Sequence, residues 1–189
     1  MVSARRLGKI NMANFNKIKR FILKGKAVVF IDWANVYGWR KSLKHEVDSQ
    51  KLFEYLKSYS EITEMRIYFG EDEHPKSKEF LESAGKIGYK VVTKPVKYIF
   101  IASIEGQKIY RRKCDFDMEA CIDAHAALND GVESFIFFTG DGDFEPLYKL
   151  LIKQGKQVLV IYTAGHLGRE IWNIKNGLFK AQLKNLMDI

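Results

Sequence analysis

Two apolar segments of this chain each run directly into a carboxylate. Residues 135–138 are followed by the sequence TGDGD at 139–143, and residues 27–31 are followed by Asp32. A short apolar run bounded by turn residues is typical of a strand buried on both faces. Functional residues of parallel α/β sheets gather at the carboxyl ends of the strands. We therefore expect the two segments to deliver acids to one edge of a sheet.

Predicted strands and helices alternate along most of the chain. We expect core strands at residues 27–31, 64–69, 89–92, 134–139 and 157–162. Helices are predicted at residues 48–59, where Asp48 is the N-cap, and at 76–86, 117–128 and 144–154, with a helical region at 167–187 that is broken near Gly177. Residues 98–110 predict a β-hairpin around Glu105-Gly106 that decorates the sheet edge. This pattern predicts a doubly wound α/β fold with a mostly parallel five-stranded sheet and an extra hairpin.

Basic residues are concentrated at the start of the chain. The net charge is +8, and residues 1–26 hold eight lysines or arginines and no acid. The rest of the chain has 23 basic and 23 acidic residues, so it is formally neutral. The basic surplus is either an arm that binds nucleic-acid phosphates or a solvated leader. We expect a basic extension at 1–26 and a single domain at 27–189.

The sequence favours a cytoplasmic protein that does not contact membranes. No apolar run reaches the roughly 18–20 residues that a membrane span needs. The N-terminal residues lack the apolar region and cleavage site of a secretory signal. Cys114 and Cys121 match neither a zinc framework nor a natural disulfide pair, so we expect reduced cysteines that pack in the fold. Assembly into a homo-oligomer is left open.

The acids predict a divalent-metal site on physical grounds. Carboxylates gathered within about 4 Å of each other repel by roughly 4 kcal/mol per pair at an effective dielectric near 20. Such a cluster either takes up protons or recruits a cation. Oxygen ligands of this kind suit Mg²⁺ or Mn²⁺. Asp117 and Asp123 of the predicted helix point about 120° apart, so both do not bind one ion directly.

Three segments together carry a family resemblance. They are FIDWANVYG at 30–38, KCDFD at 113–117 and TGDGDFEPL at 139–147. In this order and spacing they resemble the NYN domains of the LabA-like branch of the PIN-like nuclease superfamily, and the resemblance runs from about residue 27 to 162. It implies a metal-dependent ribonuclease that acts without a covalent intermediate.

The resemblance also implies a role for each acid. Asp32, Asp117 and Asp141 would ligate Mg²⁺ or Mn²⁺. Asp143 would assist directly or through water, and Asn35 would orient Asp32 or a substrate phosphate. The reaction implied is hydrolysis of an RNA phosphodiester bond by metal-activated water.

Contacts to RNA are predicted from two groups of side chains. A basic run precedes the helix at 117, where it would guide phosphates towards the metal; its members are Lys108, Arg111, Arg112 and Lys113. The alternative is a solvated hairpin edge on which basic residues discourage aggregation. Trp33, Tyr37 and Trp39 either stack on bases or pack in the core.

Other interpretations of the same residues stay open. Asp117 and Asp143 could instead be helix N-caps. The protein could be an RNA-binding or regulatory module that keeps the fold without turnover. A phosphatase is disfavoured because Ala34 stands where a second acid should follow Asp32, and dinucleotide binding is disfavoured because no GxGxxG follows the first strand.

Overall fold

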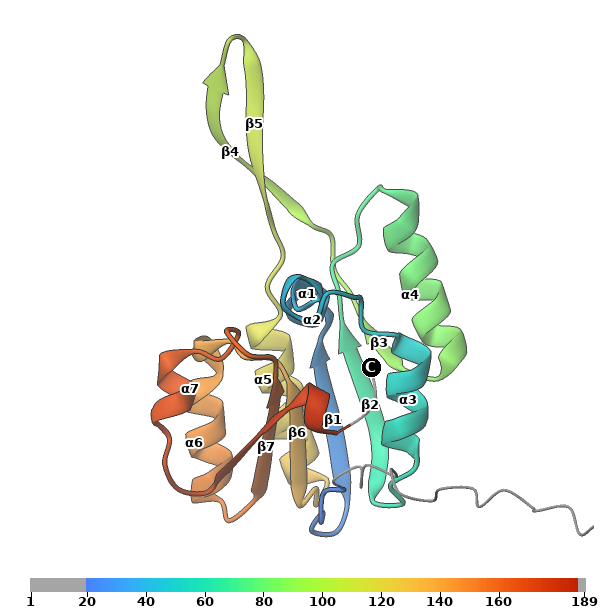
Figure 1. Cartoon of the computed structure of the whole chain (residues 1–189), viewed down its shortest axis with the longest axis vertical. Helices are drawn as coiled ribbons and strands as arrows, with labels where there is room; N and C mark the ends of the chain where they lie inside the picture. The colour runs from blue at the N-terminus through green and yellow to red at the C-terminus, as the bar shows by residue number, and fades with distance from the viewer. Residues whose placement is uncertain (1–19, 187–189) are drawn as a thin grey trace, which may run out of the picture.

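The computed structural model describes residues 20–186, which form a parallel sheet with helices on both faces (Figure 1). The sheet has six strands in the order β3-β2-β1-β6-β7-β8, and every neighbouring pair is parallel. The strands are β1 (Ala27–Asp32), β2 (Ile62–Tyr68), β3 (Lys90–Val92), β6 (Ser134–Phe138), β7 (Gln157–Tyr162) and β8 (Leu178–Gln182). The predicted doubly wound α/β class is confirmed.

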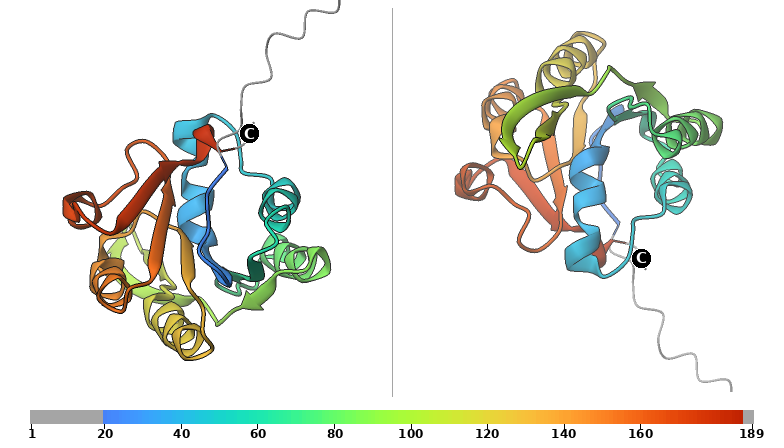
Figure 2. Two further views of the ribbon diagram at one scale, coloured as in Figure 1. Left: turned by 90° about the horizontal axis from the view of Figure 1, so that it is seen from below. Right: turned by 90° about the horizontal axis from the view of Figure 1, so that it is seen from above.

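Helices cover the two faces of the sheet as separate groups (Figure 2). One face packs against α1 (Trp33–Gly38), α2 (Arg40–Leu43), α3 (Ser49–Lys57) and α4 (Pro75–Ile87). The other face packs against α5 (Asp117–Asn129), α6 (Glu145–Lys153) and α7 (Arg169–Asn173). Residues 20–186 also contain two short 3₁₀ segments, η1 (Gly142–Phe144) and η2 (Leu183–Asn185).

Strand β1 supplies side chains to both cores because alternate residues of a strand point to opposite faces. Val29 and Ile31 belong to the core under α1–α4, whereas Val28 and Phe30 belong to the core under α5–α7. The Phe30 ring stacks on Phe137 of β6 at 4.8 Å between centroids. Each such fully buried side chain stabilises the fold by about 1.5–3 kcal/mol. Because β1 is buried on both faces, its sequence from residue 27 to 31 is an unbroken apolar run.

Local signals fix the ends of α3 and α4. The predicted N-cap is confirmed at Asp48, whose carboxylate accepts hydrogen bonds from the backbone N–H groups of Gln50 at 2.9 Å and Lys51 at 3.1 Å. Helix α4 begins at Pro75, where a missing N–H costs nothing, and ends at Gly88, which has φ +119°.

The predicted helical region at 167–187 and the predicted count of five strands are both wrong. Between residues 167 and 186, α7 is the only α-helix and η2 is a single 3₁₀ turn, whereas residues Leu178–Gln182 form β8, which pairs with β7 in parallel. Gly177 has φ +80° and turns the chain back towards the sheet. The five residues LFKAQ at 178–182 are too few to distinguish strand from helix by periodicity, and pairing with the free edge of β7 decides the outcome.

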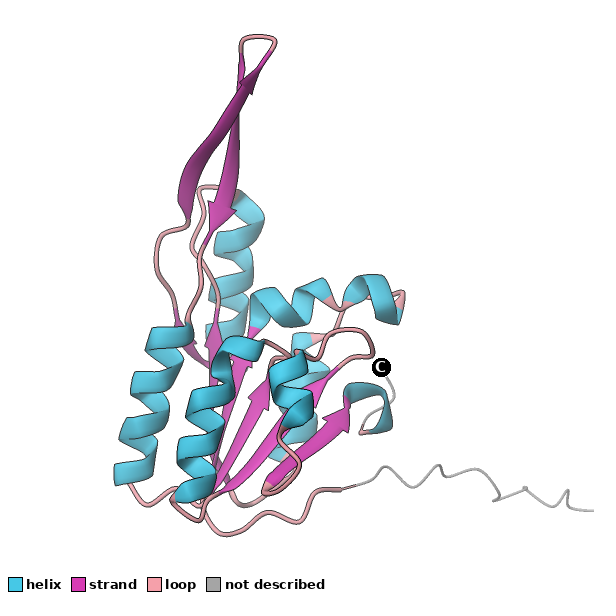
Figure 3. Cartoon of the chain, turned by 90° about the vertical axis from the view of Figure 1, so that its left-hand side faces the viewer, coloured by secondary structure: helices cyan, strands magenta, loops and turns pink. Residues whose placement is uncertain are grey.

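The predicted hairpin is confirmed, but its expected place at the sheet edge is wrong. Strands β4 (Lys97–Ile104) and β5 (Gln107–Lys113) form a separate antiparallel sheet. They turn at Glu105 and Gly106, which both have positive φ. The hairpin projects from the body on the side where the strands of the main sheet end (Figures 1 and 3). We call residues 97–113 the arm.

Residues 20–26 run along the start of the sheet. Leu23 is buried, and the backbone N–H of Lys24 donates to Ser134 Oγ at 2.9 Å and to Gln157 Oε1 at 3.0 Å. Residues 1–19 of the expected basic extension lie outside the described residues. Between residues 20 and 186, no helix combines the length and the apolar character that crossing a bilayer requires.

Two glycines at the end of α4 predict opposite effects on stability. Gly88 has positive φ, and a Cβ there would lie 2.8 Å from the Phe53 ring. Gly85 is helical, and a Cβ there would meet nothing closer than Val91 at 4.0 Å. Gly88→Ala should lower the free energy of unfolding by about 1–2 kcal/mol. Gly85→Ala should raise it by about 0.5–1 kcal/mol. Urea unfolding followed by circular dichroism measures both, and effects of equal sign would contradict this account.

Candidate active site

The candidate site lies where the chain reverses its direction of travel across the sheet. Strands β1 and β6 are neighbours, and Ile31 pairs with Phe138. The order β3-β2-β1-β6-β7-β8 runs outwards to one side from β1 and to the other side from β6. Ligands of open α/β sheets bind in the crevice outside the strand ends at such a point. Asp32 at the end of β1 and the 139–143 segment after β6 flank this crevice.

Asp32 is held by the first turn of α1. Its Oδ1 accepts a hydrogen bond from the backbone N–H of Asn35 at 3.1 Å. Burial, which is the largest cause, and the charges of Asp141 and Asp117 together raise the pKa of Asp32 to about 6, although hydrogen bonds from the backbone lower it. The three predicted metal ligands therefore interact electrostatically, although they come from distant parts of the sequence.

Asp141 occupies the turn that links β6 to η1. Its backbone N–H donates to Thr139 Oγ1 at 3.2 Å, and its own Oδ1 accepts from the backbone N–H of Asp143 at 3.1 Å. Asp143 is exposed and lies inside η1, so it is not the N-cap of the helix that follows. The capping alternative for Asp143 is therefore wrong.

Asp117 opens α5 without capping it. Phe116 occupies the N-cap position, and no side chain caps this helix, so the capping alternative for Asp117 is wrong as well. Burial raises the pKa of Asp117, and the charges of Asp141, Asp115 and Asp143 add to the effect. Half-buried Asp117, at the start of α5, therefore belongs to the same acidic cluster as Asp141.

Asp123, further along α5, contacts side chains of β2. Its carboxylate accepts a hydrogen bond from the Tyr68 hydroxyl at 2.8 Å and forms an ion pair with Arg66 Nη1 at 2.7 Å. The divergence predicted for Asp117 and Asp123 agrees with this arrangement, and Asp123 fastens α5 to β2.

Asn35 joins the first acidic segment to the third. Its Oδ1 accepts from Trp39 Nε1 at 2.9 Å and from the backbone N–H of Gly140 at 3.4 Å. Trp39 is fully buried, so it packs in the core and presents no face to a base. The Asn35 side chain thus fixes the spacing between the end of β1 and the loop after β6.

Two further features of the site gave no signal in the sequence. Tyr148 of α6 is fully buried, and its hydroxyl has no hydrogen-bond partner among residues 20–186. Burial raises its pKa, with smaller effects from the charges of Asp141 and Asp32. Gly140 packs against the backbone of residues 166–168: a Cβ would overlap the His166 carbonyl, and Gly168 N–H donates to Gly140 O at 2.7 Å.

A divalent ion fits the donor chemistry of this cluster. In the part of the chain that the structure describes, no three His, Cys, Asp or Glu side chains already stand close enough to hold a metal ion. The fit is therefore argued from chemistry: three carboxylates interact repulsively here, and an orphaned hydroxyl is buried beside them. A hard cation would relieve the repulsion, and its water would give the Tyr148 hydroxyl a partner.

The basic residues predicted to bind RNA lie on the arm, but they do not form one patch. Paired residues of antiparallel strands share a face, and successive residues alternate. Arg112 and Lys108 therefore lie on one face of β5, and Arg111 and Lys113 on the other. Arg112 forms an ion pair with Asp72, and Lys113 pairs with Asp115 at 3.2 Å.

Comparisons with known proteins agree with this geometry. The model of a family described as NYN domain matches residues 26–176. The chain is 26% identical over 150 residues to the Low amplitude and bright protein LabA of Synechococcus elongatus, covering 78% of this chain and 79% of LabA. The crystal structure of a Vibrio parahaemolyticus protein of unknown function superposes with a TM-score of 0.66 at 22% identity, covering 89% of this chain and all of that one. At this identity the second likeness shows the fold alone.

The raised pKa of Asp32 predicts a pH-dependent gain in stability for Asp32→Asn. Well below pH 4 the carboxyl is neutral in both the folded and the unfolded wild type, because the ordinary pKa is 3.8. Between that pH and about 6, the unfolded chain loses its proton first, so wild-type stability falls as the pH rises. A pKa difference of this size corresponds to about 3 kcal/mol. Asparagine caps α1 equally well and carries no charge.

In metal-free buffer with EDTA, we expect Asp32→Asn to be about 2–3 kcal/mol more stable than wild type near pH 8, with no gain near pH 4. Thermal unfolding at several pH values measures this. The control for loss of a negative charge is Asp130→Asn, because Asp130 is an exposed residue at the C-terminal end of α5, outside the acidic cluster. A destabilised Asp32→Asn near pH 8 would contradict the account.

Proposed function

We propose that this chain, which belongs to the NYN domain family of the PIN-like nuclease superfamily, is a ribonuclease that uses a divalent metal ion. The single observation that carries the proposal is that the charge of Asp141 helps to raise the pKa of both Asp32 and Asp117 at the switch point of the sheet, which sets these three acids near one another. Three acids whose charges repel in a partly buried crevice are costly unless a cation neutralises them. The family assigns such a cluster to phosphodiester hydrolysis.

Each residue of the cluster has a distinct part in the proposed mechanism. Asp32, Asp117 and Asp141 would hold Mg²⁺ or Mn²⁺. The bound ion would favour deprotonation of water and offset charge that develops on the phosphoryl group. Asn35 is a positioning residue that keeps Asp32 and the Gly140 loop at a fixed spacing. Exposed Asp143 stands on the solvent side, where it would orient the attacking water.

RNA is the proposed substrate, and the arm supports this choice. The arm projects from the side of the molecule where the strands of the main sheet end (Figure 1), and Asp32 is the last residue of β1. We assign phosphate contacts to the basic side chains of the arm because lysine and arginine gain affinity for nucleic acid by releasing counterions. They are Lys108, Arg111, Arg112 and Lys113. The two unpaired cysteines support a cytoplasmic location.

A second candidate is an RNA-binding module without turnover. The observation that favours it is the spread of the carboxylates, which leaves no group of three ready to ligate an ion among residues 20–186. In this case the fold and the basic arm would bind RNA, and the acids would serve mainly as a negatively charged edge of the binding surface.

A cleavage assay separates the two candidates. We expect labelled single-stranded RNA to be cut in the presence of Mn²⁺, and the double variant Asp32→Asn/Asp141→Asn to be at least about a hundredfold slower, because several kcal/mol of charge stabilisation depend on the ion. Asp130→Asn removes an exposed carboxylate outside the cluster and should cut at the wild-type rate. Equal cleavage by the double variant would reveal a contaminating nuclease. RNA binding without cleavage by wild type would favour the second candidate.

A further inference from the structure

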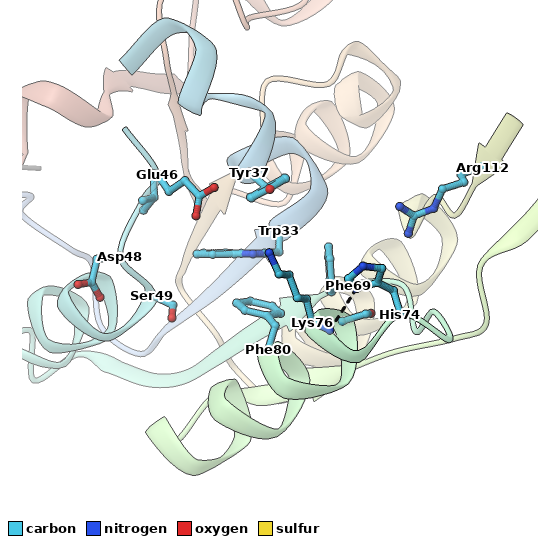
Figure 4. Close-up of a pocket in the computed structure, with 12 residues that line it drawn as sticks. Trp33, Tyr37, Glu46, Asp48, Ser49, Phe69, His74, Lys76, Phe80 and Arg112 are labelled. Carbon is cyan, nitrogen blue, oxygen red and sulfur yellow. Dashed lines mark hydrogen bonds between the residues drawn. The ribbon is translucent and has the colours of Figure 1, made fainter. Parts of the chain in front are cut away.

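A large groove lies on the α1–α4 side of β1, and Trp33, the residue after Asp32, is part of its lining. It encloses about 700 Å³, enough for a nucleotide, and its floor is aromatic (Figure 4). Trp33, which directly follows Asp32, stacks on Phe80 with 4.8 Å between ring centroids. Phe69, at the end of β2, meets the Phe80 ring edge-on at 5.1 Å. The floor of the groove therefore includes the sequence neighbour of Asp32, a residue of the acidic cluster.

The rim of the groove is basic at one end and acidic at the other. Figure 4 shows Arg112 towards one end and Glu46 and Asp48 towards the other. Exposed Lys76 also lines the groove, and its ammonium group forms no ion pair with the residues that the structure describes. Tyr37 is 42% exposed on the upper wall. Lys76 suits a phosphate, and the acidic end suits hydrogen-bond donors such as ribose hydroxyls or base amino groups.

The base of the arm is fastened to the wall of this groove. Buried Asp72 accepts a hydrogen bond from the Tyr98 hydroxyl at 2.7 Å and forms an ion pair with Arg112. The backbone N–H of Asp72 donates to Ser77 Oγ at 3.2 Å, and Ser77 belongs to α4 and lines the groove. The arm therefore has a defined orientation relative to the groove.

One face of the arm continues the aromatic and basic character of the groove. Tyr98 pairs with Arg112, and Phe100 pairs with Tyr110 two residues further along, on the same face. The Phe100 and Tyr110 rings meet edge-on at 5.9 Å and are 55% and 48% exposed. Lys108 lies beyond them on this face. The opposite face instead exposes isoleucines; they are Ile99, Ile104 and Ile109.

We propose that the groove and the aromatic face of the arm form one track for single-stranded RNA, in which the groove takes an unpaired base and the arm stacks the bases that follow. The proposal rests on RNA being the substrate of the adjacent acids. Exposed aromatic side chains interleaved with basic ones bind single strands, because every base offers a ring face and every linkage a negative charge. A duplex keeps its bases stacked and paired, so it offers no base to the groove.

Binding experiments in EDTA test the track without turnover. The probes are fluorescein-labelled oligouridylates of about four and about twelve nucleotides, read by anisotropy. Tyr37→Ala and Lys76→Glu should each weaken both probes about tenfold, because the groove is used by either length. Phe100→Ala/Tyr110→Ala should weaken the long probe about tenfold and the short probe less than about twofold.

Matched controls lie beside each substituted residue. Lys78→Glu makes the same charge change on α4 at an exposed residue outside the groove, and Ile99→Ala/Ile109→Ala truncates the opposite face of the arm. Both should bind either probe within about twofold of wild type. Duplex RNA of the same length should bind wild type at least about tenfold more weakly.

Three outcomes would overturn the track. The groove and arm variants could bind RNA as well as their controls, or duplex RNA could bind as tightly as a single strand. In the third outcome, only the isoleucine variant loses RNA binding, and it loses self-association at the same time. The last would make the arm a contact between copies or with another protein. Failure of the proposed function gives a different result. If RNA binds with the expected pattern but is not cleaved in Mn²⁺, the ribonuclease proposal is wrong and the track proposal still holds.

Discussion

The burial of a carboxylate at the end of a central strand is the constraint on which the rest of this structure depends. Asp32 ends β1, where burial and the nearby acids raise its pKa to about 6. A fold does not keep a buried charge beside like charges for stability, since neutral residues would serve better there. The cost is consistent with a site whose acids have a chemical task.

The architecture around this carboxylate fixes the other acids relative to it. The parallel pairing of β1 with β6 brings the 139–143 segment to the same edge, and Asn35 bonds across to Gly140. Gly140 in turn packs on the backbone of residues 166–168, where a side chain would not fit. The start of α5 supplies Asp117 from a third direction. Beside this frame lie the groove floored by Trp33 and Phe80 and the projecting arm, which are the two parts of the proposed RNA track.

Much of the fold follows from local signals in the sequence, and the remainder depends on contacts that no local pattern encodes. The runs at 27–31 and 134–139 predicted central strands because burial on both faces demands unbroken apolar residues, and Asp48 predicted a helix start because its carboxylate caps two N–H groups. Strand β8 was missed because residues 178–182 are extended only by pairing with β7. The direction of the arm was missed because Asp72, which fastens it, lies far from it in the sequence.

The same division applies to the site. Asp32 and Asp141 could be singled out because they follow apolar strands, whereas Asp117 was added by the family resemblance. Tyr148 and Gly140 could not, since a helical tyrosine and a glycine in a turn have no distinctive pattern; only the fold buries the Tyr148 hydroxyl and packs Gly140 on the backbone of residues 166–168.

Crystals of the protein soaked in Mn²⁺ test the central claim most directly, because anomalous scattering locates the ion independently of any assay. The account predicts a peak bound by oxygens of Asp32 and Asp141, with Asp117 in its coordination sphere directly or through water, at distances of about 2.0–2.3 Å for direct ligands. The peak should vanish in Asp32→Asn/Asp141→Asn crystals. No peak at the β1–β6 edge, or an ion bound only by acids elsewhere on the molecule, would contradict it.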